Sequence, residues 1–141
     1  MFNFNGIALM FNLHPQLEKD CIHIADLSLC RILLANDQQY PWFILVPMVN
    51  EISEIIDLSE AQQQQLWQES ARFSHLLKAA YAPDKLNVAA LGNVVPQLHI
   101  HHVARFTTDA AWPAPIWGKH PTVPYGAAQI EVIKREILAL L

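Results

Sequence analysis

Short apolar runs alternate with polar segments in the first third of the chain. Residues 21–27, 30–35 and 42–46 form three such runs, and prolines bound the third on both sides. Runs of this length with such boundaries are typical of β-strands. The polar residues 36–39, between the second and third runs, suit a turn between neighbouring strands. This part of the chain therefore predicts three antiparallel strands.

The spacing of apolar residues changes after residue 57. Ser59 and Gln62 match a capping box, and apolar residues then recur at largely helical spacing until Pro83. This pattern predicts one long helix that covers a face of the sheet. A second amphipathic pattern runs from Ile130 to Leu141 and predicts a C-terminal helix.

Two further strands are predicted after the long helix, at residues 86–91 and 98–106. Together with the earlier strands they give an α+β domain with an antiparallel sheet of about five strands, covered by helices. Beyond Phe106 the chain is rich in tryptophan and proline and irregular through residues 112–118, before the C-terminal helix begins.

The last predicted strand contains the most distinctive chemistry of the chain. Because side chains in a strand alternate between two faces, one face is expected to present Gln97, His99, His101, Val103 and Arg105. His102 falls on the opposite, apolar face, where it needs a buried hydrogen-bond partner or a place near the sheet edge. We assign it no catalytic role. Two imidazoles on one face indicate a reactive site.

Composition and charge limit the class of protein. The chain has 141 residues, 52% of them hydrophobic and 16% charged, which fits one compact domain. Its formal net charge of −4 and the absence of a basic run disfavour nucleic-acid binding. The glycines are scattered singly, so phosphate loops of the P-loop and Rossmann types are excluded.

The N-terminal segment and the two cysteines bear on the expected cellular compartment. Cys21 and Cys30 have neither CxxC spacing nor the density of a disulfide scaffold, and we expect reduced, buried thiols. Residues 1–13 lack a basic leader and are too short to span a bilayer. We therefore expect a cytoplasmic protein without membrane attachment.

Residues 97–103 read Gln-Leu-His-Ile-His-His-Val. This stretch resembles the signature His-φ-His-φ-His-φ-φ, where φ is apolar, of the histidine triad (HIT) superfamily of nucleotide hydrolases and transferases. The order of predicted elements is also similar, from about residue 21 to residue 106. The resemblance implies a single HIT-like domain over residues 1–141, with a tail and helix at 107–141. It further implies a small-molecule nucleotide as ligand, a homodimer, and no cofactor.

The resemblance also implies roles in catalysis. His99 matches the nucleophile that attacks the α-phosphate of a dinucleoside polyphosphate or nucleotide conjugate, and His101 matches the histidine that supports it. Gln97 stands in place of the first histidine of the triad. An amide can hydrogen-bond a phosphate or leaving group, but it cannot deliver a proton. We therefore expect a preference for leaving groups that depart as stable anions.

Substrate-binding residues are expected around the two histidines. By resemblance, Asn36 lies near the ribose, Asn87 on the strand that approaches the phosphates, and Asn93 in the loop before the triad. Arg105 has the geometry to bind a phosphate in bidentate fashion. Trp117, like the tryptophan five residues before it, is a candidate to wall a pocket or stack on a base.

Two departures from the family pattern keep other functions open. Pro41-Trp42 stands where many members have Gly-His, and Val94 stands where many have Ser or Thr. A noncatalytic nucleotide sensor on the same fold is therefore the main alternative. A metal site would need a third ligand that the neighbouring sequence does not supply. A purely structural or interaction protein is the third alternative.

Overall fold

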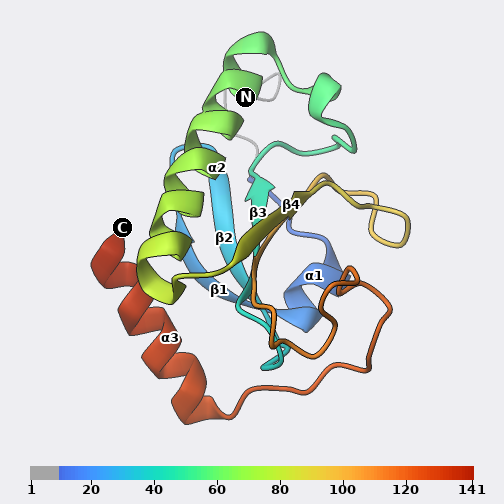
Figure 1. Ribbon diagram of the computed structural model, residues 1–141. Coiled ribbons are helices and arrows are strands. Elements are labelled where there is room, and N and C mark those ends of the chain that lie inside the picture. Colours follow the sequence, from blue (N-terminus) through green and yellow to red (C-terminus); the bar gives the residue numbers. More distant parts are fainter. Residues whose placement is uncertain (1–9) are drawn as a thin grey trace.

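The computed structural model describes residues 10–141, which form a five-stranded antiparallel sheet with helices on both faces (Figure 1). The strand order is β1-β2-β3-β5-β4. The elements are α1 (Pro15–Asp20), β1 (Cys21–Asp26), β2 (Cys30–Ala35), β3 (Trp42–Pro47), η1 (Ile55–Asp57), α2 (Glu60–Tyr81), β4 (Lys85–Ala89), β5 (Ile100–Arg105) and α3 (Ala127–Leu140). The predicted α+β class and the five strands are confirmed.

The predicted long helix has the expected boundaries. The Ser59 hydroxyl accepts a hydrogen bond from the Gln62 backbone N–H, and the Gln62 side chain accepts one from the Ser59 N–H. These two bonds satisfy N–H groups that the first helical turn leaves unpaired. The helix ends where Ala82 adopts a left-handed conformation with φ of 46°, directly before Pro83.

The largest apolar core lies between the sheet and the helices α2 and α3, which cover the same face (Figure 1). Phe73 and Leu77 of α2 are fully buried here, with Ile137 of α3. Phe43 of β3 packs edge-to-face on Phe73, with ring centroids 5.3 Å apart. Burial of this apolar surface supplies most of the driving force that holds the helices on the sheet.

The opposite face of the sheet is covered by α1 and by the segment between β5 and α3 (Figure 1). Two smaller apolar clusters lie here, one around Leu17 of α1 and one around Val103 of β5. The short helix α1 was not predicted. It begins with His14 as its N-cap and Pro15 at its first position, and it is too short to show a hydrophobic period.

The two strands that follow the long helix are shorter than predicted. β4 ends at Ala89, which pairs with His101, and β5 begins only at Ile100. His99 therefore lies just before the strand, with its backbone outside the β4 pairing.

Neither cysteine forms a disulfide. Burial raises the pKa of Cys21 to about 12 and raises that of Cys30 further, so both thiols stay protonated near neutral pH. Of the terminal segment analysed in the sequence, residues 1–9 lie outside the described residues. Within residues 10–141, no helix has both the length and the apolar character that crossing a membrane requires.

Candidate active site

His99 and His101 line an open pocket on the face of the sheet opposite α2 and α3. Its volume is about 520 Å³, within the range of small-molecule sites. The lining comes from α1, the turn after β2, the start of β3, the loop before β5 and the segment before α3. The lining residues are Gln16, Leu17, Lys19, Asp20, Cys21, Ala35, Asn36, Asp37, Trp42, Ile44, Val94, Val95, His99, His101, Trp117, Thr122 and Pro124.

The ring of His99 is oriented by the backbone. Its Nδ1 lies 2.7 Å from the carbonyl oxygen of Gln97, and a carbonyl only accepts, so Nδ1 carries the proton. Burial lowers the pKa of His99, the Gln97 carbonyl opposes this shift, and the nearby His14 adds to it. A neutral imidazole with its proton on Nδ1 has a free electron pair on Nε2. This arrangement leaves the Nε2 electron pair of His99 available for a bond to an electrophile.

His101 lies beside His99, with ring centroids 5.0 Å apart. Its Nδ1 accepts a hydrogen bond from the indole Nε1–H of Trp42 at 3.0 Å, and the centroid of the Trp117 ring lies 5.2 Å from that of His101. Burial, with smaller effects from His99 and His102, lowers the pKa of His101 to about 3. His101 is therefore neutral near neutral pH.

Gln97 does not line the pocket. Its side-chain oxygen accepts a hydrogen bond from the His14 backbone N–H at 2.8 Å, and its side-chain nitrogen donates to the Asn12 carbonyl at 2.9 Å. Both ends of the amide thus hold the segment that leads into α1. In this arrangement Gln97 acts on the site through His99, whose ring its backbone carbonyl orients.

The side chain of Arg105 is also engaged in hydrogen bonds within the protein. Its side chain is 2% exposed, and it donates to both carboxylate oxygens of Asp109, to the side-chain oxygen of Asn87 and to the carbonyl of Ala114. A phosphate contact by Arg105 would require these buried bonds to break. Asn87 faces this network and, like Arg105, lies outside the pocket lining. The sequence could not predict these bonds, because the partners of Arg105 come from the neighbouring strand β4 and from the loop after β5.

The remaining predicted residues divide between pocket and surface. Asn36 lines the pocket, and its side-chain oxygen accepts from the Tyr125 backbone N–H, which ties the segment before α3 to the turn after β2. Trp117 also lines the pocket, with its ring beside that of His101. Asn93 is exposed and is not part of the lining, whereas its neighbour Val94 is.

Asp37 is a lining residue that the sequence analysis missed. Its side chain is buried, and its Oδ1 accepts from the Gln39 backbone and side chain and from the Val123 backbone. Within the described residues, Oδ2 has no hydrogen-bond partner. An Asn-Asp pair in a polar turn after a strand is the only sequence signal that pointed to this position.

His102 lies on the helix-facing side of the sheet, as its position in the strand predicted. Its Nε2 is 2.7 Å from the Ser70 hydroxyl of α2, and its Nδ1 is 3.1 Å from the Ile100 carbonyl. Both nitrogens thus have buried partners, and burial lowers the pKa of His102 to about 4. This histidine stabilises the contact between helix and sheet.

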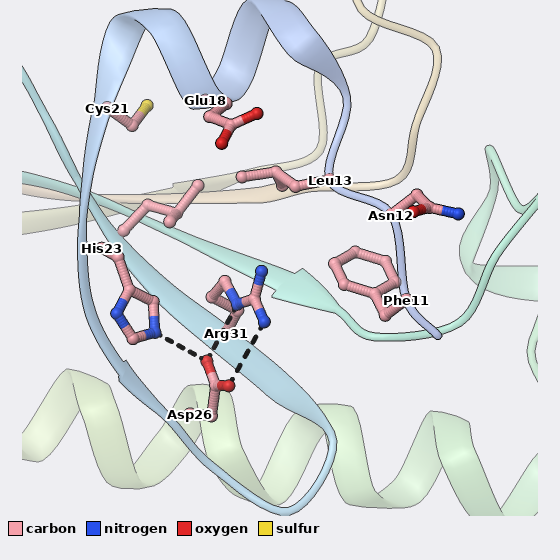
Figure 2. A pocket seen from close by; sticks show the side chains of 9 residues that line it. Phe11, Asn12, Leu13, Glu18, Cys21, His23, Asp26 and Arg31 are labelled. Atoms are coloured by element: carbon pink, nitrogen blue, oxygen red, sulfur yellow. Dashed lines mark hydrogen bonds and ion pairs between the residues drawn. The ribbon is translucent and has the colours of Figure 1, made fainter. Parts of the chain in front are cut away.

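A second pocket of about 480 Å³ lies at the outer strands β1 and β2 (Figure 2). Asp26 there lies between His23 and Arg31 and bonds both at 2.9 Å. The Arg31 guanidinium also lies over the ring of Phe11. Because His23, Asp26 and Arg31 pair with one another and the Cys21 thiol is protonated, we look for the chemistry in the histidine pocket.

The metal-site alternative requires converging ligands. Among residues 10–141, no group of three or more His, Cys, Asp or Glu side chains is arranged to hold an ion. The two histidines instead have their Nδ1 atoms bound to a backbone carbonyl and to an indole N–H.

Comparison with known proteins agrees with this geometry. Residues 16–108 match the HIT domain family. A histidine triad protein from Marinobacter aquaeolei is 48% identical, with a TM-score of 0.91 over 94% of this chain and 96% of that one. One from Bradyrhizobium japonicum is 45% identical, with a TM-score of 0.90 over 93% and 98%. One from Sinorhizobium meliloti is 38% identical, with a TM-score of 0.91 over 93% and 97%.

No protein of curated function matches the chain. The family match covers well over half of the sequence, and the structural relatives agree over nearly their whole length. The sequence signature, the five-stranded sheet and the paired histidines of the pocket lead to the same assignment. The chain belongs to the histidine triad (HIT) family.

Proposed function

We propose that this protein is a nucleotide hydrolase or nucleotidyl transferase that attacks the α-phosphate of a dinucleoside polyphosphate or nucleotide conjugate through His99. The observation that supports this most directly is the orientation of the His99 ring. Its Nδ1 is held by the Gln97 carbonyl, so the electron pair of Nε2 is free in a pocket of nucleotide size.

In the proposed reaction, Nε2 of His99 forms a bond to the α-phosphorus while the bond from phosphorus to the leaving oxygen breaks. The leaving group keeps the electron pair and departs as an anion. The proton stays on Nδ1 of His99, which continues to donate a hydrogen bond to the Gln97 carbonyl. Water, or another acceptor, then attacks the phosphorus of the nucleotidyl-histidine while the bond from phosphorus to Nε2 breaks. The electron pair returns to Nε2 and the proton of the attacking hydroxyl is released to solvent, which regenerates His99. Neutral His101 stabilises the phosphoryl oxygens by a hydrogen bond.

The proposed nucleoside site lies between Trp117 and the turn after β2. Trp117 offers a face on which a base can stack. Asn36 and Asp37 together present an amide donor and a carboxylate oxygen, which suit ribose hydroxyls. Among the described lining residues Lys19 is the only cation, and we assign it to the phosphates. Arg105 and Asn87 act indirectly, by fixing β5.

The homodimer is also a proposal. β4 is an edge strand, paired with β5 alone among the described strands, so one row of its backbone N–H and C=O groups is unpaired within the chain. Val88 and Leu91, on and just after this strand, are exposed. A second copy of the chain can satisfy this edge by extending the sheet. A monomer in sedimentation at micromolar concentration would contradict the dimer.

The reaction is tested by intact-protein mass spectrometry after brief incubation with a dinucleoside polyphosphate, with released nucleotide assayed in parallel. A transient nucleotidyl adduct that is lost in His99→Ala is expected. The matched control is His102→Gln, because His102 lies on the opposite face and should leave the adduct intact. Product release that survives His99→Ala would refute the proposed nucleophile.

The alternative on the same fold is a noncatalytic nucleotide-binding protein. The arrangement of Gln97 favours it, because an amide engaged with two backbone groups leaves the first triad position without a side chain that contacts ligand. A thermal shift induced by the nucleotide, together with neither adduct nor product in that experiment, would establish this alternative. A cytoplasmic location stays a prediction of the sequence.

A further inference from the structure

Two tryptophans flank His101 in the pocket. Trp42 is the first residue of β3, and Trp117 belongs to the segment before α3. Their ring centroids lie 5.7 and 5.2 Å from that of His101. Only Trp42 of the two is hydrogen-bonded to the histidine, from Nε1 to Nδ1 at 3.0 Å. Two indole rings therefore lie beside the same imidazole, and one of them donates a hydrogen bond to it while the other does not.

This bond fixes the position of the proton on His101. An indole nitrogen carries a hydrogen and can only donate, so Nδ1 of His101 must present its electron pair. A neutral imidazole that accepts at Nδ1 has its proton on Nε2. Protonation of Nδ1 would set two N–H groups against each other across 3.0 Å. His101 is thus limited to one neutral tautomer, with Nε2–H as its only donor.

The sheet itself positions the two side chains. β3 and β5 are hydrogen-bonded neighbours, with Trp42 opposite Val103 and Ile44 opposite His101. Trp42 therefore lies diagonally across from His101, on the same face, at a separation that a large side chain spans. Because both residues are in paired strands, the geometry of the bond exists before any ligand arrives.

The surroundings favour the same neutral state. Two other histidines are close to His101, namely His99 before the strand and His102 within it. The remaining titratable or charged groups that line the pocket with His101 are Lys19 and Asp20 on α1 and Asp37 after β2. Burial of the ring, with additional effects of the two histidines, lowers the pKa of His101. The two aspartates line the pocket, but no hydrogen bond joins either of them to the His101 ring among the described residues.

We propose that Trp42 is a positioning residue that holds His101 as a neutral Nε2–H donor, which hydrogen-bonds a phosphoryl oxygen of the substrate and takes no proton from the site. The hydrogen bond to a phosphoryl oxygen rests on the proposed nucleotide reaction, whereas the tautomer does not. It follows that His101 does not act as general base or as an imidazolium acid. The acid limb of the rate profile then contains one ionisation, that of His99.

The tautomer is measured directly by long-range ¹H–¹⁵N correlation of the imidazole rings in ¹⁵N-labelled protein. His101 in the unmodified protein should show an unprotonated Nδ1 and a protonated Nε2, unchanged between about pH 5 and pH 8, within which ordinary histidines titrate. Protonated Nδ1 in the unmodified protein would overturn the proposal without any variant. This readout does not depend on substrate.

The matched variants are Trp42→Phe and Trp117→Phe. Trp42→Phe keeps an aromatic ring but removes the donor, so His101 should show a mixture of tautomers or a titration within the measured range. Trp117→Phe makes the same replacement at an indole that does not hydrogen-bond His101, so the tautomer should stay single. An unchanged single tautomer in Trp42→Phe would overturn the proposal. If Trp42→Phe does not fold, Trp42→His, which can still donate, replaces it and should preserve the tautomer.

Kinetics connect the tautomer to the reaction. Trp42→Phe should lower kcat on the order of tenfold, the effect of losing one orienting hydrogen bond, with a smaller change in KM. A second ionisation should appear on the acid limb of its profile, and Trp42→His should recover part of the lost rate. A merely structural role would change neither the tautomer nor the shape of the profile. Absence of turnover in the unmodified protein would refute the nucleotide reaction but not the tautomer assignment.

Discussion

Replacement of Asp109 by alanine provides a quantitative test of the buried network behind the site. The Asp109 carboxylate accepts two hydrogen bonds from Arg105 and one each from the backbone N–H groups of Phe106, Ala111 and Trp112. The side chains of Asp109 and Arg105 are 5% and 2% exposed. Asp109→Ala therefore leaves a guanidinium charge in the interior with no counter-charge in contact.

Loss of one partner of a buried ion pair costs about 3–5 kcal/mol, most of it from the stranded charge. A protein of 141 residues has an unfolding entropy of about 0.3 kcal/mol/K near its melting temperature. The expected decrease in Tm is therefore about 10–17 °C. Urea unfolding followed by tryptophan fluorescence or circular dichroism gives the same loss as a free energy of unfolding.

The pH dependence provides an independent check. Burial opposes ionisation of Asp109, but the Arg105 guanidinium and the three backbone N–H groups outweigh it and lower the pKa from 3.8 to about 2. A lowered pKa in the folded state means that the contribution is complete above about pH 4 and is lost as the pH falls towards 2. The stability difference between Asp109→Ala and the unmodified protein should shrink over that window.

The double variant Arg105→Met, Asp109→Ala separates a stranded charge from a lost packing contact. It removes both charges and should be more stable than Asp109→Ala alone, because no buried guanidinium remains unpaired. A loss below about 1 kcal/mol in Asp109→Ala would refute the buried network. The network would also be refuted if the loss of unfolding free energy in the double variant equalled the sum of the losses in Asp109→Ala and Arg105→Met.

Three further predictions follow from the contacts of the site and its supports. Ser70→Ala leaves Nε2 of His102 without its buried partner and should lower the free energy of unfolding by about 1–3 kcal/mol, measured by urea denaturation, whereas Ser70→Thr retains the hydroxyl. Gln97→Ala should speed amide hydrogen exchange at His14 by releasing the segment before α1, while exchange in β2 stays constant. In steady-state assays a dinucleoside polyphosphate should be cleaved faster than a nucleoside phosphoramidate, because neither His99 nor neutral His101 is poised to protonate an amine. The reverse order would show that an unrecognised acid serves the leaving group.

Local patterns in the sequence determined most of the fold. Apolar runs bounded by turn residues placed the strands, and the Ser59–Gln62 capping box placed the start of α2, because both signals act between residues close in the chain. Strand periodicity likewise put His99 and His101 on one side and His102 on the other, as the pocket and the Ser70 contact show. The short helix α1 lacked enough residues for such a signal.

Only the tertiary structure decided what the polar side chains of the site do. The strand periodicity predicted one face for Gln97, Arg105 and the two histidines. In the structure, however, the Gln97 amide bonds a backbone segment 83 residues away, and the Arg105 guanidinium is enclosed by a loop carboxylate and a neighbouring strand. Trp42 meets His101 across 59 residues of sequence. Periodicity specifies the face on which a side chain lies, but its hydrogen-bond partner is set by whichever segments the packing brings there. The chemistry of each polar group depends on that partner, and therefore on the fold.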